Sequence, residues 1–348
     1  MKQKTVLSII ICLIVIMAGV AVGSVFIPPG VIFQIIGSKI SGADLPEAVK
    51  PATVSILWNL RIPRALLAFI AGGALSVSGA VMQSVLRNPL ASSYTIGVSS
   101  GASLGAGIVI LYGFSIPALG ALTLPLMGFV FGFATILLAI ALASRLDGQM
   151  ENNTIILVGM VFSLFVNALI TLMSALSRDH MQRLIFWQMG SFSMRDWQAV
   201  YILAPVVAAG TLFILRYHRE MDIMTFGEEQ AKVTGVNLRT VKWALLTASA
   251  AVTGSVIAFV GVIGFVDFVA PHIVRKLFGA SHRVVIPMSA VFGGAFMVIC
   301  DLAARTVAAP SELPVGAVTA LLGAPFFAYI YFSKRGGHVK TGRRIGRL

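Results

Sequence analysis

A carboxylate, a proline and an imidazole lie close together in the apolar segment 264–275 (GFVDFVAPHIVR). Asp267 and His272 could hold an ion or a proton, and Pro271 stands between them. Ionisable groups at membrane depth are costly and usually line a cavity, and short apolar segments interrupted by proline often mark a translocation path. Asp267, Pro271 and His272 are therefore candidates for such a path, with a purely structural pairing of Asp267 as the equal alternative.

Three arginines form a second polar feature. Arg61 and Arg64 flank a proline at residues 60–64 (LRIPR), where we expect a membrane helix to begin, and Arg305 follows Asp301 by four residues. Arginine pairs in bidentate fashion with carboxylates, so Arg61 and Arg64 could dock acidic groups of a soluble partner. The alternative is snorkelling into lipid headgroups. Asp301 and Arg305 have the order that favours a local helical ion pair, and Glu312 lies close by in the turn 311–314 (SELP).

The segment 226–238 (FGEEQAKVTGVNL) is polar and helix-prone, unlike the apolar sequence around it. Lipid does not explain such a segment. We interpret it as a short amphipathic element at the membrane surface, within a coupling segment of about 218–240, where a soluble protein could push on the chain.

No enzyme signature is found. The sequence contains neither G-x-x-x-x-G-K-[ST] nor H-E-x-x-H, so we expect no Walker-type ATP site and no zinc protease site. The five histidines and the two cysteines, Cys12 and Cys300, lack metal-ligand spacing. The expectation is a chain that has no catalytic residues and binds neither metal nor cofactor.

Composition places the chain in a membrane. Of 348 residues, 57% are hydrophobic and only 11% are charged, whereas soluble domains carry roughly 25% charged residues. A spanning helix needs about 20 apolar residues, and ten such runs fill the chain as one all-α polytopic domain, residues 1–348. The predicted spans are 6–27, 63–86, 94–112, 118–143, 154–176, 200–217, 241–260, 265–277, 284–302 and 315–332.

The positive charge sets the orientation. With the N-terminus in the cytosol, 18 of the 26 Lys and Arg residues fall on the cytosolic side, including those of the basic tail 334–348. Positive residues stay inside, so both termini are expected in the cytosol, and the net charge of +13 needs no nucleic-acid partner. The N-terminal run could pass for a signal peptide, but it is long enough to be an uncleaved first helix. Gly97, Gly101 and Gly105 predict close helix packing, and an inverted repeat of two halves is possible.

Several motifs together resemble the FecCD permease family, the membrane subunits of type II ABC importers for ferric siderophores, haem and cobalamin. The resemblance runs in order along nearly the whole chain. It rests on residues 60–64, 71–92 (AGGALSVSGAVMQSVLRNPLAS), 97–102 (GVSSGA), 226–237, 260–275, 281–287 (SHRVVIP) and 301–327 (DLAARTVAAPSELPVGAVTALLGAPFF). It implies ten membrane helices, a homodimer in a bacterial cytoplasmic membrane, two cytosolic ATPase subunits that carry the ATP and Mg²⁺, and an extracytoplasmic binding protein.

The resemblance also implies roles for single residues. Phe226, Gly227, Glu228, Glu229, Ala231 and Gly235 match the element that enters a groove of the ATPase, and Arg61, Arg64 and Arg305 match arginines that meet acidic residues of the binding protein. Asp267 departs from the family, which usually has a small residue there. A ferric siderophore is the expected cargo, with haem and cobalamin as alternatives. The rival function is an ion-driven secondary transporter that would use Asp267 or Asp301.

Overall fold

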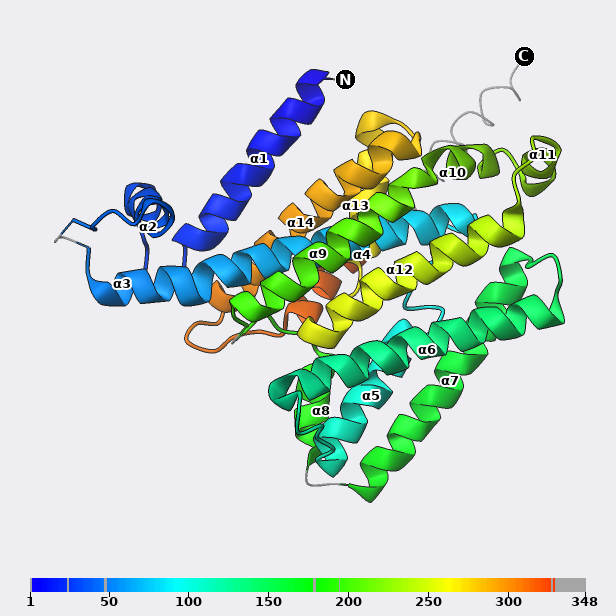
Figure 1. The fold of residues 1–348 in the computed structure, drawn as a ribbon, viewed down its shortest axis with the longest axis horizontal. Coiled ribbons are helices and arrows are strands. Elements are labelled where there is room, and N and C mark those ends of the chain that lie inside the picture. Colours follow the sequence, from blue (N-terminus) through cyan, green and yellow to red (C-terminus); the bar gives the residue numbers. More distant parts are fainter. Residues whose placement is uncertain are drawn as a thin grey trace, which may run out of the picture.

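The computed structural model describes residues 2–23, 25–46, 49–177, 180–193, 195–326 and 328. Regular structure in these ranges is helical throughout (Figure 1). The helices are α1 (Lys2–Ala21), α2 (Pro29–Ser41), α3 (Pro51–Ser55), a π-helical segment (Ile56–Arg61), α4 (Ile62–Val85), α5 (Val98–Tyr112), a 3-10 turn (Gly120–Leu122), α6 (Thr123–Leu146), α7 (Asn152–Leu176), α8 (Met181–Gln188), α9 (Trp197–Arg216), α10 (His218–Met224), α11 (Glu228–Val233), α12 (Leu238–Val260), α13 (Val266–Phe278), α14 (His282–Thr306) and a last helix, Val315–Phe326.

Seven helical stretches in the described residues are long and apolar enough to cross a membrane. They are Gln3–Ala21, Pro51–Val85, Gly120–Leu146, Asn152–Leu176, Trp197–Arg216, Leu238–Val260 and His282–Thr306, and each overlaps a predicted span. The other three predicted spans coincide with shorter helices, α5, α13 and Val315–Phe326. That these three also cross the bilayer stays a prediction, as do the orientation and the inverted repeat. The predicted basic tail lies outside the described residues.

The start of the second span differs from the prediction. The helix begins at Pro51 rather than at Pro63, so Arg61 and Arg64 lie inside a continuous helix and not at its exposed first turn. The backbone passes Pro63, which has no N–H, through the π-helical turn Ile56–Arg61, where the amide of Ile62 donates to the carbonyl of Leu57 five residues back. Such π segments locally absorb an irregularity in an α-helix. The short helices α2 and α8 were also not predicted, since both lie in connections between the predicted spans.

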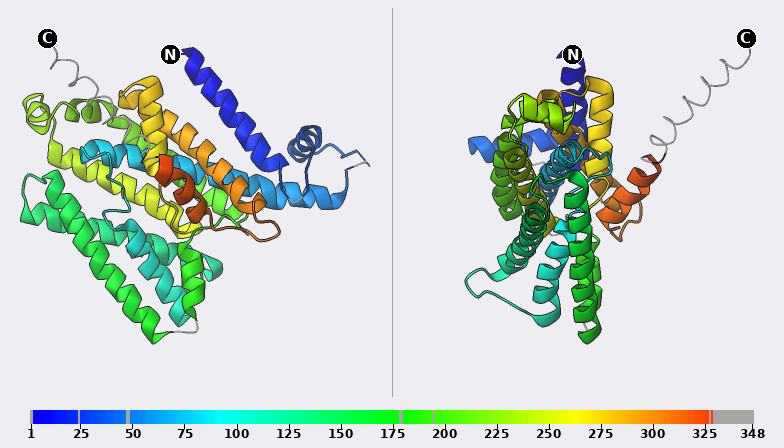
Figure 2. Two further views of the ribbon diagram at one scale, coloured as in Figure 1. Left: turned by 180° about the vertical axis from the view of Figure 1, so that it is seen from behind. Right: turned by 90° about the vertical axis from the view of Figure 1, so that its right-hand side faces the viewer.

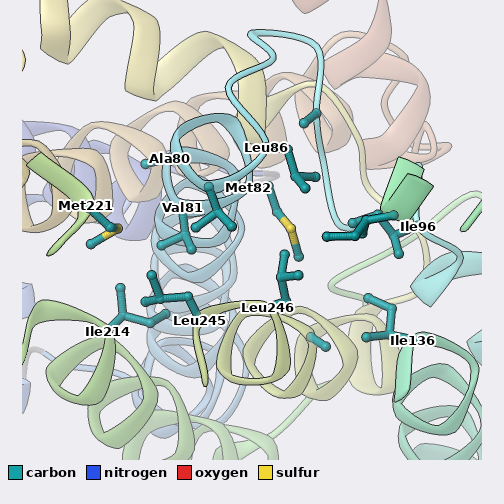
Figure 3. Packing of buried hydrophobic residues seen from close by; sticks show 14 of the residues in the cluster. Ala80, Val81, Met82, Leu86, Ile96, Ile136, Ile214, Met221, Leu245 and Leu246 are labelled. Atoms are coloured by element: carbon teal, nitrogen blue, oxygen red, sulfur yellow. The ribbon is translucent and has the colours of Figure 1, made fainter. Parts of the chain in front are cut away.

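Helix α12 lies between two groups of helices (Figures 1 and 2). On one side stand α5, α6, α7 and α8, and on the other α4, α9, α13 and α14. The largest apolar core fills the space where α4 meets α12. Figure 3 shows Val81 and Met82 of α4 against Leu245 and Leu246 of α12, with Met221 of α10 entering from the side. Because α10 is part of this core, the predicted coupling segment is packed onto the membrane helices and does not hang free.

The glycine ladder is used for close packing, as expected. A Cβ on Gly101 would overlap the carbonyl oxygen of Phe131 and the side chain of Thr135 on α6, and one on Gly105 would overlap the carbonyl of Met127. We therefore expect Gly101→Val to lower stability by about 1–3 kcal/mol through overpacking. The measurement is the thermal unfolding midpoint in detergent. Gly37→Ala is the matched control, because a Cβ on this helical glycine of α2 meets nothing within 4 Å; equal midpoints for both variants would contradict the packing.

Candidate coupling and docking sites

The predicted coupling segment forms two short helices, α10 and α11, at one end of the molecule (Figure 1). Gly227, with a positive φ of 132°, is the residue before α11, and Gly235, with φ of 86°, follows it. Such backbone angles favour glycine, so these two residues set the turns into and out of α11. Ala231 is fully buried and holds the inner face of α11 against the core.

Phe226, Glu229 and Val233 are among the exposed side chains of this segment. Phe226 is 76% exposed, Val233 is 89% exposed, and the side chain of Glu229 is 88% exposed. Glu228 points inward instead and bonds the ammonium of Lys242 at 2.8 Å. The predicted coupling residues therefore form two sets. Phe226 and Glu229 are open to a partner, whereas Glu228 and Ala231 fix the shape of the segment. Val233, which was not among the single residues predicted for coupling, belongs to the open set.

Helix α10 is anchored by its own polar contacts. Asp222 accepts hydrogen bonds from the backbone amide of His282 at 2.8 Å and from the Ser281 hydroxyl at 3.2 Å, and it lies 2.6 Å from the His282 ring. The other ring nitrogen of His282 lies 2.6 Å from the Ser84 hydroxyl at the end of α4. This chain ties the coupling segment to the start of α14 and the end of α4, and nothing in the sequence spacing had predicted it.

Two of the three predicted docking arginines, Arg64 and Arg305, meet at Asp301. Arg64 contacts the Asp301 carboxylate at 2.9 Å and Glu312 at 2.8 Å. Arg305 lies 3.7 Å from Asp301, which has only 2% of its side chain exposed. The local pair of Asp301 with Arg305 expected from their spacing is thus the looser contact, and the closer one joins α4 to α14.

Arg61 and Arg305 also donate hydrogen bonds to the backbone of the N-terminal region. Arg61 reaches the carbonyls of Ala21 at 2.9 Å and of Val25, and Arg305 reaches that of Gly19. Arg61 is 6% exposed and the side chains of Arg64 and Arg305 are 13% and 9% exposed. Much of their hydrogen-bonding capacity is used inside the protein, and a docking role for them stays a prediction.

The ion pair between Arg64 and Glu312 makes the stability of the fold depend on pH. The hydrogen bond from Arg64 lowers the pKa of Glu312 from its ordinary value of 4.5, so the pair stabilises the fold above that value and is lost as the pH falls through the lowered pKa. We expect the wild-type unfolding midpoint to fall more steeply than that of Glu312→Gln below pH 4.5. Because Glu312 is 39% exposed, the effect is small, about 0–1 kcal/mol. Parallel pH profiles for the two proteins would contradict it.

The three path candidates lie at α13. Asp267 and Pro271 are buried and His272 is half-buried. Among the described residues, neither carboxylate oxygen of Asp267 has a hydrogen-bond partner. Gln83 donates to the Asp267 carbonyl at 3.0 Å. The surroundings of Asp267 are those of a helix start packed against α4, and its place in a path stays a prediction.

A polar hollow of about 320 Å³ lies among α5, α7 and α8, beside Tyr94 and Val262. The hydroxyl and amide side chains around it are Ser99, Ser100, Ser103, Ser163, Asn167 and Gln188. These uncharged side chains are not among the residues predicted from the sequence, where their signal is serine recurring on α5 at residues 99, 100 and 103. Uncharged donors and acceptors can contact a hydrophilic solute without holding it tightly.

Comparisons with known proteins agree with this architecture. The FecCD transport family matches residues 11–333. The permease YvrB of Bacillus subtilis is 39% identical over 323 residues, covering 92% of this chain and 91% of that protein. The hemin transport permease HmuU of Yersinia pestis is 36% identical, covering 80% and 84%. A metal-chelate type ABC transporter solved in an inward-facing conformation aligns with a TM-score of 0.82 and 26% identity, over 96% of this chain and all of that one.

These similarities confirm the resemblance drawn from the motifs. The chain is a multi-pass membrane protein and a permease subunit without an ATPase site of its own. Its matched segment includes the predicted coupling segment and the arginine cluster, which consists of Arg61, Arg64, Asp301, Arg305 and Glu312. The chain belongs to the FecCD transport family of bacterial ABC importers.

Proposed function

We propose that the chain is the permease of a metal-chelate importer and works as a homodimer with two cytosolic ATPase subunits and an extracytoplasmic binding protein. The observation that carries this proposal is the coupling segment. Phe226, Glu229 and Val233 are exposed, while Ala231 and Met221 are fully buried in the core. A rigidly mounted, exposed surface outside the apolar spans suits a contact with a soluble motor, and it has no use in a carrier driven by an ion gradient.

The arginine cluster is the proposed docking site of the binding protein. Glu312 is the most exposed member of the cluster, and Arg64 binds it in bidentate fashion. A carboxylate of the binding protein could replace Glu312 on Arg64, because both would use the same planar fork of donors. Arg61 and Arg305 then hold the ends of α1 and α14 in place around this contact.

The proposed cargo is a ferric siderophore, with haem and cobalamin as alternatives. The polar hollow supports this choice, because its hydroxyl and amide groups suit a hydrophilic chelate better than the apolar face of haem. The related permease HmuU is named for hemin, so the family does not decide the cargo. We expect ATP and Mg²⁺ on the ATPase subunits, and the FecCD family generally binds no cofactor.

Uptake by cells tests the cargo. Cells with and without this gene receive ferric siderophore, haem and cobalamin, each with a radioactive label. We expect uptake of the ferric siderophore to disappear with the gene while uptake of the other two is unchanged. Loss of haem or cobalamin uptake instead would replace the proposed cargo, and unchanged uptake of all three would contradict each of these three cargoes.

A further inference from the structure

Lys242 is a lysine with no exposed surface, in the first turns of α12. Its ammonium lies 2.6 Å from the carbonyl oxygen of Met150 and 2.8 Å from the carboxylate of Glu228. An ammonium buried without partners would cost several kcal/mol, so these two contacts account for its charge. They come from two different segments: Glu228 begins α11, and Met150 lies in the turn between α6 and α7.

The turn that supplies the carbonyl is itself firmly held. Asp147 accepts hydrogen bonds from the amides of Gln149 at 2.9 Å and Glu151 at 2.6 Å, and Met150 is fully buried with a positive φ of 54°. A non-glycine residue in that conformation is uncommon and needs support from its surroundings. The carbonyl of Met150 is therefore presented to Lys242 by a turn with little freedom to adjust.

A second lysine reinforces the same connection from outside. Lys232 of α11 contacts Gln149 of the turn at 3.0 Å and Glu229 at 3.1 Å. Its side chain is 43% exposed, so this contact is worth less than the buried one. Through the two lysines α11 is joined to α12 and to the end of α6, and α7 follows directly on that turn.

We propose that Lys242 is a positioning residue that fastens the coupling segment to α12 and to the α6–α7 turn, so that a push on α11 moves α7 as a rigid body. The inference rests on the proposed coupling to an ATPase. It matters for transport because Ser163 and Asn167 of α7 line the polar hollow. Glu228, predicted from the family motif to belong to the coupling element, acts in this account by holding Lys242.

The test uses the complete transporter with its ATPase subunits in proteoliposomes. Nitroxide labels on Leu164→Cys of α7 and Tyr201→Cys of α9, which are 70% and 68% exposed, report the displacement of α7 when ATP and vanadate are added. In Lys242→Met we expect ATPase binding and ATP hydrolysis to persist while the shift in label distance is lost. Transport per ATP should fall about 5- to 150-fold, the range of a typical coupling between sites.

Two further variants separate positioning from folding. Lys276→Met removes an exposed lysine from the last turn of α13 and should leave both readouts unchanged. Lys242→Met combined with Glu228→Gln removes both charges, so thermal stability should recover relative to Lys242→Met while the label shift stays absent. Recovery of the shift in the double variant would mean that Lys242 only balances charge, and the proposal would be overturned.

The remaining outcomes distinguish this proposal from the proposed function. A normal label shift in Lys242→Met overturns the positioning role and leaves coupling to the ATPase intact. A wild-type permease that binds no ATPase overturns the proposed function itself, and this inference falls with it. If Lys242→Met does not fold, the label shift is measured in the double variant alone. That variant removes the charges of Lys242 and Glu228 together, so it leaves no unpaired buried charge.

Discussion

Replacing Asp301 by asparagine should unfold much of the protein. The carboxylate is 2% exposed and lies between the guanidinium groups of Arg64 and Arg305. Asparagine keeps the shape but removes the charge, which leaves Arg64 with Glu312 as its carboxylate partner and takes from Arg305 the carboxylate 3.7 Å away. Breaking a buried ion pair from one side costs about 3–5 kcal/mol, a large part of the roughly 5–15 kcal/mol that stabilises a typical domain. We expect low yield and a strongly lowered unfolding midpoint in detergent.

Glu312→Gln is the matched control for this prediction. It removes a carboxylate from the same arginine, but at a side chain that is 39% exposed, and exposed pairs contribute about 0–1 kcal/mol. We therefore expect a wide separation between the unfolding midpoints of the two variants at neutral pH. An Asp301→Asn protein as stable as Glu312→Gln would show that Arg64 and Arg305 find other partners and that the cluster is not held by Asp301.

Phe226→Ala should strongly weaken assembly with the ATPase without unfolding the permease. The ring is 76% exposed in the chain alone, so truncation removes little internal packing. Aromatic side chains at the centre of a protein interface often contribute 2 kcal/mol or more, which corresponds to an affinity loss of about 30-fold. The measurement is the Kd between the purified permease and its ATPase in detergent, together with the unfolding midpoint of the permease.

The control is Phe26→Ala. Phe26 is an exposed phenylalanine between α1 and α2, and it follows Val25, whose carbonyl accepts a hydrogen bond from Arg61. It should leave the ATPase affinity unchanged. If Phe226→Ala binds the ATPase as tightly as the wild type, then the surface formed by Phe226, Glu229 and Val233 is not the contact with the motor.

The fold was predictable where apolar length decides the structure. Spans such as 241–260 and 284–302 overlap α12 and α14 because about 20 apolar residues leave the chain few alternatives. The start of the second span was misjudged, since Arg61, Pro63 and Arg64 look like a helix boundary. The structure satisfies Arg61 with carbonyls of the N-terminal region, and such a contact 40 residues away leaves no trace in local sequence.

The candidate sites were likewise predictable only in part. The coupling segment was predictable because a polar stretch in an apolar chain needs an explanation. The direction of each side chain within it was not, because Glu228 and Glu229 are adjacent acids in sequence and only the position of Lys242 distinguishes them. Asp267 drew attention as a charge at membrane depth, and the structure buries it in the first turn of α13. Its part in transport stays a prediction.

The most direct test of the account measures the energy source of transport. The permease and its ATPase subunits are reconstituted in proteoliposomes with the binding protein and a labelled ferric siderophore. The account predicts import that requires ATP, stops with vanadate and continues when an ionophore collapses the ion gradients. Import that needs no ATP and stops with the ionophore would contradict coupling through α11 and would point to Asp267 as the site of an ion-driven carrier.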